Sequence, residues 1–285
     1  MADRIKSHVI ERVKLIRAWE SKNNFKEAKD LKGFKLYKNY FVPESIAKTS
    51  KTLLSFGVGG NVGFEKELAW DNKDIQAELY DPTPRSVSLI KAIIRGSGRV
   101  KIRKESDPLH GDQNKVVEER LHFNPVAYAE VNGTLPFYYD PDREPDQKEV
   151  NGTERSKEEF IRNQEQSFSL VKRQEHFESV NVQAKNLETI MKEFGISSVD
   201  MLKADIEGLW WEFGNEVLDK KIDCKFIAME FELNFEKDEK IEPALDKAQL
   251  LCDKFKANNY DVIINRRRDK LMLEMLFIRR DAYEG

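Results

Sequence analysis

The sequence predicts an α/β protein with a mostly parallel central sheet and helices on both faces. Two observations carry this prediction. Short apolar runs of strand length alternate with helix-length amphipathic segments through most of the 285 residues. The last two strand-like runs, 260–265 and 271–279, face each other across a short basic turn. They predict a closing antiparallel pair, so that one strand of the sheet is reversed.

The first 50 residues are predicted to be a helical and β extension of the main domain, which we place at 51–285. In 3–30, apolar residues recur at steps of three and four, with Lys, Arg and Glu between them, as in an amphipathic helix. The run 33–46 (GFKLYKNYFVPESI) alternates aromatic and polar residues and predicts a short β element that leads into the main domain.

An apolar strand that runs into a glycine-dense turn, 53–65 (LLSFGVGGNVGFE), gives the most informative local signal. Glycine permits the backbone angles of a tight turn and lets a ligand approach the backbone closely. Residues 64–70 can then open a helix whose free N–H groups face that ligand. A second apolar run ends on Asp81, 24 residues after Gly57, where a parallel strand presents a carboxylate to ribose hydroxyls. This order of elements predicts the nucleoside half-site of a nucleotide-binding domain.

The remaining elements are predicted in chain order. We expect a helix over 84–95, a strand over 121–129, an Asn-Gly hairpin turn, a returning strand over 135–139, and a polar insertion or lid over 140–175. Beyond the insertion we expect a strand over 180–186, a helix over 187–194 closed by Gly195, a strand over 198–205, a helix to 218, a strand over 226–231 and a helix over 241–258.

Composition bounds the class of protein and its partners. The net charge of −3 and the pI of about 6.0 give no electrostatic reason to expect nucleic acid. No run approaches the roughly 18–20 apolar residues of a membrane span. The two cysteines have neither metal-type spacing nor a disulfide framework and are predicted to be reduced thiols. We therefore expect a cytoplasmic protein with no membrane span and no nucleic-acid partner.

Charged residues cluster where buried strands end. Lys203 and Asp205 share one face of a strand, and Glu207 follows at the carboxyl end, where open α/β sheets bind ligands. Two interpretations stay open: the acceptor side of an active site, and a structural ion pair with Glu207 complementing the helix dipole. Glu230 and Glu232 follow the neighbouring strand, and with Asp205 they offer the oxygen ligands that a divalent cation prefers. Because surface carboxylates are abundant in this chain, the sequence alone predicts no metal site.

Three stretches carry a family resemblance: 57–63 (GVGGNVG), 78–82 (ELYDP) and 200–208 (DMLKADIEG). They are similar, in that order, to the glycine motif Asp-x-Gly-x-Asn-x-Gly, the element Ala-Phe-Glu-Pro and the strand Asp-x-Leu-Lys-x-Asp-x-Glu-Gly of the FkbM family of methyltransferases. The resemblance spans roughly 53–233. It implies a Rossmann-like methyltransferase fold, with a mostly parallel seven-stranded sheet that ends in an antiparallel hairpin strand.

The resemblance also implies an S-adenosylmethionine-dependent O-methyltransferase that acts on a hydroxyl of a sugar, a glycan or a small molecule. Lys203, Asp205 and Glu207 are then expected on the acceptor side, with Asp205 as general base or acceptor-orienting group. The residues expected to bind the cofactor are Phe56, Gly57, Gly59, Gly60, Asn61, Gly63, Asp81, Pro82, Asn124 and Asp205.

The chain departs from the family pattern at two positions. Gly57 stands where the family has an acid that contacts the amino acid part of the cofactor, and Trp210 stands where it often has Glu. Two rival classes therefore stay open. An NAD-dependent oxidoreductase shares the glycine turn and the ribose acid, but would normally add a second mononucleotide-binding half. A non-catalytic regulatory module could retain the cofactor fold after losing catalysis.

Overall fold

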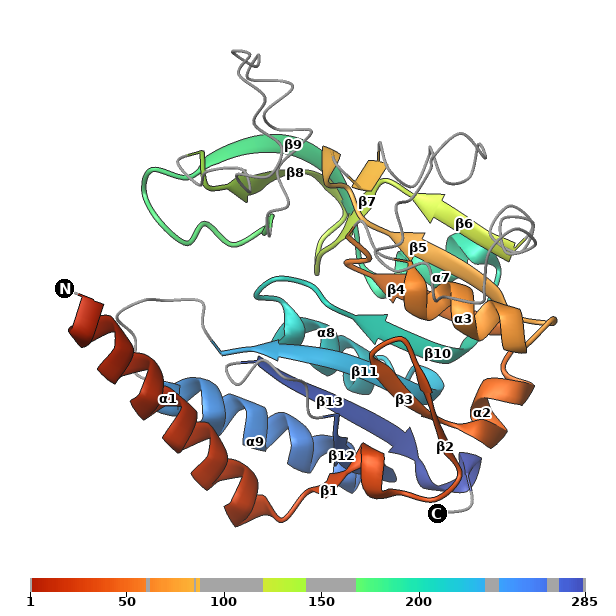
Figure 1. The fold of residues 1–285 in the computed structure, drawn as a ribbon. Helices are drawn as coiled ribbons and strands as arrows, with labels where there is room; N and C mark the ends of the chain where they lie inside the picture. Colours follow the sequence, from red (N-terminus) through yellow and green to blue (C-terminus); the bar gives the residue numbers. More distant parts are fainter. Residues whose placement is uncertain are drawn as a thin grey trace, which may run out of the picture.

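A computed structural model of the protein describes residues 2–59, 62–84, 86–87, 120–141, 168–233, 241–265 and 272–283. Its central sheet has eight strands in the order β1-β12-β13-β11-β10-β4-β5-β6 (Figure 1). In chain order these are β1 (Lys26–Glu27), β4 (Thr52–Phe56), β5 (Gln76–Tyr80), β6 (Leu121–Asn124), β10 (Ser198–Ala204), β11 (Asp223–Glu232), β12 (Tyr260–Ile264) and β13 (Met272–Arg279).

Every neighbouring pair in this sheet is parallel except the two pairs that β13 makes with β11 and β12. The predicted α/β class, with its mostly parallel sheet and one reversed strand, is therefore confirmed. Seven of the eight strands are those that the sequence predicts. The eighth, β1, is a two-residue edge strand from the N-terminal extension, which thus belongs to the sheet rather than only leading into it.

Helices cover both faces of the sheet, and each face has its own buried core. One core lies under α1 (Ala2–Asn23), α7 (Leu187–Phe194), α8 (Trp210–Asp219) and α9 (Ile241–Ala257). The other lies under α2 (Glu44–Thr49), α3 (Gly63–Asp71) and the hairpin of β2 (Phe34–Tyr37) with β3 (Tyr40–Pro43). Side chains alternate across a strand, so Met201 and Leu202 of β10 enter opposite cores.

The N-terminal helix is shorter than the sequence predicts. It ends at Asn23, whereas the apolar period had suggested a helix to about residue 30. Asn24 takes the left-handed conformation, with φ of 48°, which a helix cannot continue through. The chain then adds β1 to the edge of β12, so hydrogen bonding to the sheet replaces a further helical turn.

The predicted strand over 121–129 is divided between two sheets. Pro125 separates β6 from β7 (Val126–Tyr128), because proline has no N–H to continue a ladder. β7 belongs to a second sheet, in the order β7-β9-β8, with β8 (Gly133–Tyr139) and β9 (Glu178–Lys185). The predicted hairpin pairing across the Asn-Gly turn is therefore wrong: β9 lies between β7 and β8 and pairs with both.

Most of the predicted insertion, 142–167, lies outside the described residues, as does most of the helix expected over 84–95. The described end of the insertion is anchored on the second sheet. The ring of Phe168 packs on Phe137 and Tyr139, with centroid distances of 5.5 and 5.3 Å. Ser169 forms a bridge with Tyr138. The division into domains and the lid stay predictions.

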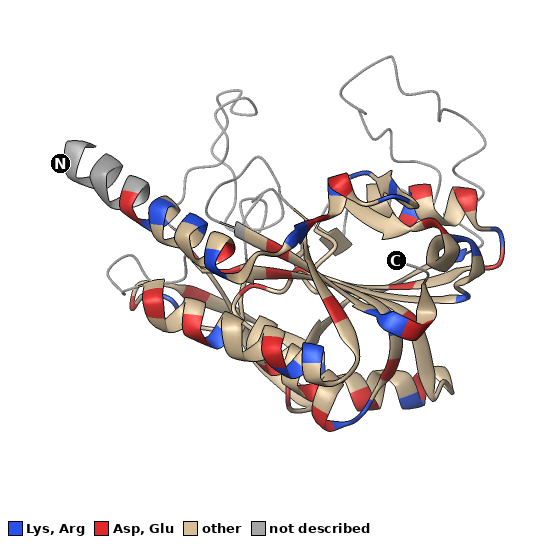
Figure 2. Ribbon diagram, turned by 90° about the horizontal axis from the view of Figure 1, so that it is seen from below, with Lys and Arg blue, Asp and Glu red and all other residues tan. Residues whose placement is uncertain are grey.

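Acidic and basic residues are interspersed along the outer helices, as Figure 2 shows for α1 and α9. Within the described ranges, no helix combines the length and the apolar character needed to cross a membrane. Both cysteines, Cys224 and Cys252, are buried and carry free thiols.

Asp200 joins the starts of β4 and β10. Its Oδ2 accepts hydrogen bonds from the N–H groups of Lys51 and Thr52, at 2.6 and 3.1 Å. Its Oδ1 lies 2.7 Å from Nζ of Lys225. Burial alone would raise the pKa of Asp200, but the hydrogen bonds from Lys225 and Lys51 lower it below the usual value. Asp200, the first acid of the DMLKADIEG stretch, therefore links the starts of β4, β10 and β11.

We predict that Asp200→Asn lowers the free energy of unfolding by about 1.5–3 kcal/mol at neutral pH, because hydrogen bonds to a charged group are lost. A carboxyl with a lowered pKa stabilises the fold above its unfolded-state pKa of about 3.9 and loses this effect as the pH falls through its folded-state pKa. Urea unfolding at pH 7 and in acid measures both effects. The exposed Asp246→Asn is the control, and equal unfolding midpoints for both variants at pH 7 would contradict the assignment.

Candidate active site

The carboxyl ends of β5, β4 and β10 are fastened to one another by backbone hydrogen bonds. The N–H of Gly57 donates to the carbonyl oxygen of Tyr80 at 2.9 Å, and the N–H of Asp205 donates to that of Phe56 at 3.1 Å. These bonds continue the parallel ladder one residue past the strands. Three of the residues predicted from the sequence, Phe56, Gly57 and Asp205, consequently lie side by side at this edge of the sheet.

The glycine turn after β4 has no room for a side chain at its first position. Gly57 has a φ of 68°, and a Cβ atom built on it would lie 1.7 Å from the carbonyl oxygen of Asp205. The acid found here in the family could not fit, which explains the departure. Gly59 also has a positive φ, of 58°, but a Cβ there would meet nothing within 4 Å. Gly60 and Asn61 lie outside the described residues.

Asp81 follows β5 directly and holds the glycine turn. Its Oδ2 accepts a hydrogen bond from the N–H of Gly59 at 2.7 Å, and its Oδ1 accepts one from the N–H of Thr83 at 2.8 Å. The side chain is buried. Burial raises the pKa of Asp81, and the bonds from Thr83 and Gly59 oppose that rise. Pro82, which has no N–H, follows at the turn. The predicted ribose acid and the glycine turn are thus brought into direct contact.

Asn124, at the end of β6, lies next to Asp81. Its carbonyl oxygen accepts the N–H of Asp81 at 3.1 Å, and its Nδ2 donates to Oε2 of Glu78 at 2.9 Å. Burial raises the pKa of Glu78 to about 7, and the bond from Asn124 only partly offsets this. Gly63, the last predicted member of the turn, is the first residue of α3.

Lys203 is buried and lies near an acid that the sequence did not associate with it. Its Nζ lies 4.0 Å from Oε1 of Glu65, which also accepts the hydroxyl of Ser55 at 2.5 Å. Glu65 is buried in the first turn of α3, where a negative charge complements the helix dipole. Lys203 and Glu65 are 138 positions apart. No local pattern links them, so only the fold reveals this pair.

Glu207 is paired with Arg173, a residue from the described end of the insertion. The hydroxyl of Ser169 donates to the backbone carbonyl of Glu207 at 2.8 Å. The loop after β10 is therefore bound to the segment that precedes β9. Sequence reasoning missed Arg173, because it is one of many charged residues in a polar stretch without a motif.

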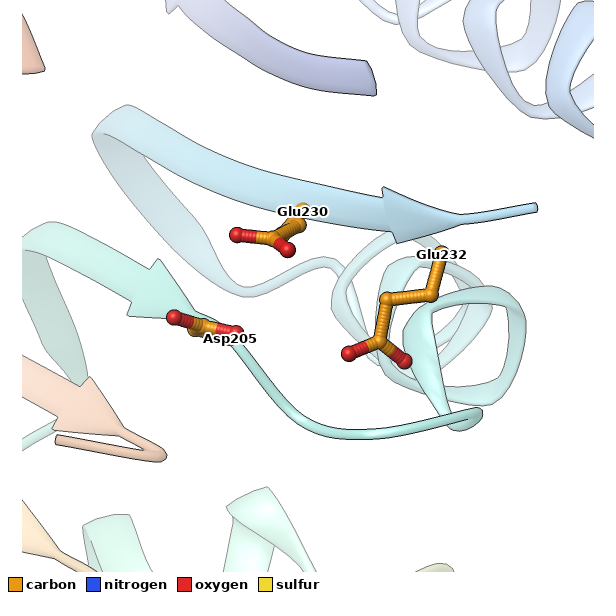
Figure 3. Close-up of side chains that lie close together, drawn as sticks. All are labelled: Asp205, Glu230 and Glu232. Atoms are coloured by element: carbon orange, nitrogen blue, oxygen red, sulfur yellow. The ribbon is translucent and has the colours of Figure 1, made fainter. Parts of the chain in front are cut away.

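Asp205 is one of three carboxylates that lie close together. Glu230 and Glu232 extend from the end of β11 toward it, and each residue has an oxygen within 4.8 Å of the others (Figure 3). Oε2 of Glu232 accepts the N–H of Gly208 at 2.7 Å. Burial and then the charge of Glu207 hold the pKa of Glu232 well above its usual range. A site of this kind can accept a proton or hold a cation.

The two tryptophans after this loop differ in environment. Trp210 is buried and stacks on Phe231, with ring centroids 4.5 Å apart, so the residue that departs from the family pattern belongs to the core. Trp211 is partly exposed, and Nζ of Lys254 lies 5.2 Å from its ring centroid. Of the pair, Trp211 is the more exposed.

A family model described as the methyltransferase FkbM domain matches residues 20–262. No curated protein sequence matches the chain.

The chain is also similar to three solved structures. An O-methyltransferase from Bacillus cereus in complex with SAH shows 6% identity and a TM-score of 0.42, covering 94% of this chain and 90% of that one. The fibrillarin pre-rRNA processing protein of Methanococcus jannaschii shows 9% identity and a TM-score of 0.41, covering 88% of this chain and 73% of that one. The precorrin-6y C5,15-methyltransferase of Geobacter metallireducens shows 8% identity and a TM-score of 0.36, covering 90% of this chain and 95% of that one.

We predict that Gly57→Ala destabilises the protein far more than Gly59→Ala. Both substitutions place a Cβ on a left-handed residue, which costs about 1–2 kcal/mol. Only the first also drives that atom into a backbone carbonyl, so we expect a total loss above about 3 kcal/mol or failure to fold. Urea unfolding of the pair measures the difference. Similar losses for the two variants would mean that β4 and β10 do not approach so closely.

Proposed function

The chain belongs to the FkbM methyltransferase family, and on that premise we propose that it is an O-methyltransferase that methylates a hydroxyl of a sugar, a glycan or a small molecule. Its cofactor is S-adenosylmethionine. The observation that carries the proposal is the contact between Asp81 and the glycine turn, beside the carboxylates at the carboxyl ends of β10 and β11. The proposed nucleoside-binding residues and the proposed proton acceptor therefore lie at the same edge of the sheet.

The residues at this edge fit the cofactor. The open position at Gly59 leaves the backbone of the turn accessible, as a bound nucleoside requires. The buried carboxylate of Asp81 lies directly after β5, at the place where such sheets bind ribose hydroxyls. We assign binding of the cofactor to the following residues: Phe56, Gly57, Gly59, Gly60, Asn61, Gly63, Asp81, Pro82, Asn124 and Asp205. When bound, S-adenosylmethionine supplies an electrophilic methyl group on its sulfonium.

On the acceptor side, the chain must hold a hydroxyl oxygen about 3 Å from that methyl carbon and take its proton. We assign this role to Asp205, as base or orienting group, with Glu207 beside it. With S-adenosylmethionine bound, the new C–O bond would form as the C–S bond breaks, giving S-adenosylhomocysteine, and the carboxylate of Asp205 would take the hydroxyl proton. Lys203, through its pair with Glu65, maintains the charge and position of the strand end.

An uncharged, ring-bearing hydroxyl compound is the acceptor class that we favour. The family resemblance, the net charge of −3 and the accessible ring of Trp211 support it, since an aromatic face can stack on a sugar. The proposal places the enzyme in the cytoplasm, because both thiols are free, as in a reducing compartment. It includes no nucleic-acid partner.

We predict that Asp81→Asn weakens S-adenosylmethionine binding by about ten- to a hundredfold. Each hydrogen bond to a charged group contributes about 1.5–3 kcal/mol, and 1.4 kcal/mol is a factor of ten. Isothermal titration calorimetry measures the affinity, with Asp246→Asn as the control. Asp81→Glu keeps the charge and should retain more affinity than Asp81→Asn. Unchanged affinity in a folded Asp81→Asn variant would refute the assignment.

We predict that Asp205→Asn lowers kcat by about 10²–10⁴, while cofactor affinity changes much less. Transfer of labelled methyl groups to a panel of monosaccharides, glycans and phenolic compounds first identifies the acceptor, and turnover is then compared between the wild type and the variant. Asp246→Asn again serves as the control. Near-normal turnover in Asp205→Asn would show that Asp205 is not the base, and Lys203, Asp205 and Glu207 would then be interpreted as a structural ion-pair cluster. Absence of both cofactor binding and methyl transfer in the wild type would refute the proposed function.

A further inference from the structure

The acids at the carboxyl ends of β10 and β11 converge from two neighbouring strands. Glu230 and Glu232 are two residues apart on one face of β11, and Asp205 follows the end of β10 (Figure 3). Their three ligand oxygens lie within 4.8 Å of one another. In the described part of the chain, no other group of three such residues offers a metal ion this arrangement.

One oxygen of this cluster is left without a hydrogen bond. Glu232 is 7% exposed; its Oε2 accepts the N–H of Gly208, whereas Oε1 is fully buried and finds no partner among the described residues. Figure 3 shows this carboxylate directed toward the segment that carries Asp205. A buried carboxylate oxygen without a partner is costly, and a bound cation would satisfy it.

The basic side chains at this edge already have acids of their own. Nζ of Lys203 lies 4.0 Å from Glu65, on the α3 side. Arg173 forms its ion pair with Glu207, whose side chain in turn adjoins that of Glu232. Glu230 also stands opposite a further buried acid, Glu274, in the register of β11 and β13. Four carboxylates, those of Asp205, Glu230, Glu232 and Glu274, therefore gather at the ends of these strands.

The spacing of the oxygens suits a hard divalent cation. Two oxygen ligands of one ion are at most twice the metal–oxygen distance apart, about 4.2 Å for Mg²⁺ and about 4.6–5.2 Å for Ca²⁺. The three oxygens all lie within 4.8 Å of one another, so they are close enough to share one ion of this size. Three protein oxygens fill only part of a shell of six or more, so positions remain for water and for an acceptor oxygen.

We infer that Asp205, Glu230 and Glu232 bind a divalent cation, and that the open positions hold the acceptor hydroxyl. This rests on the proposed function and narrows the acceptor to a compound whose hydroxyl, or two adjacent hydroxyls, can coordinate a metal. A bound cation would lower the pKa of the coordinated hydroxyl, so its proton could leave to water as the oxygen takes the methyl group, and Asp205 would act in the orienting role rather than as the base. Asp205 then orients the acceptor through the metal.

Binding of Mn²⁺ to the full-length protein, freed of metal by chelation, tests the inference without reference to activity. Electron paramagnetic resonance of free Mn²⁺ should show one site per chain, from which Mg²⁺ or Ca²⁺ displaces it. Glu232→Gln should weaken binding by at least about tenfold, since losing a ligand costs no less than losing a supporting partner. The exposed Glu242→Gln on α9 is the matched control and should bind as the wild type does.

Equal Mn²⁺ binding by Glu232→Gln and the wild type would overturn the inference, as would the absence of stoichiometric binding by the wild type. A proton shared between the carboxyl groups would then be what offsets their buried negative charge. If Glu232→Gln does not fold, Asp205→Asn replaces it, and a Mn²⁺-dependent rise in Tm of the wild type gives a second measure. Titration with S-adenosylmethionine in chelator separates the two claims. Cofactor binding and methyl transfer that survive without metal refute the cation site alone, whereas loss of cofactor binding in every condition refutes the proposed function.

Discussion

The close approach of two backbone segments, at Gly57 and Asp205, is the constraint on which the candidate site depends. The carbonyl oxygen of Asp205 occupies the space that any side chain at position 57 would need. The ladder hydrogen bond from Asp205 to Phe56 maintains this approach. An acid at position 57 would push the two strand ends apart. Glycine there lets the turn that is proposed to bind the cofactor lie against the loop that begins at Asp205.

Compensation of buried charge then divides the site into parts with different roles. Lys203 and Glu65 neutralise each other beneath the strand end, and Asp200 is satisfied by Lys225 and backbone N–H groups at the far end of β10. These charges stabilise the sheet. Asp205 and its acidic neighbours on β11 lie at the carboxyl end of the sheet, the edge that faces the proposed acceptor. The convergence of three carboxylates is what suits this edge to the proposed chemistry.

The second sheet connects this edge to the insertion. β8 and β9 extend from the main domain in Figure 1, and the segment that returns to β9 binds the Glu207 loop through Arg173 and Ser169. A shift in the position of this segment would therefore move Glu207, which lies two residues from Asp205. Substrate selectivity in the proposed reaction is expected to depend on these contacts, because they set the position of the loop that adjoins the acceptor.

Local chemistry allowed the sequence to define most elements of this fold. The helix Leu187–Phe194 ends at Gly195, whose φ of 67° only glycine adopts readily, and the alternation of apolar runs located seven strands. Which strands pair was decided by the tertiary structure: β9 separates β7 from β8, although the Asn-Gly turn favoured a hairpin. The partnership of Lys203 with Glu65 was equally beyond the sequence. Turn residues and the periodicity of apolar residues determine structure over only a few residues. Strand order and ion pairing depend instead on which distant segments the buried cores bring together.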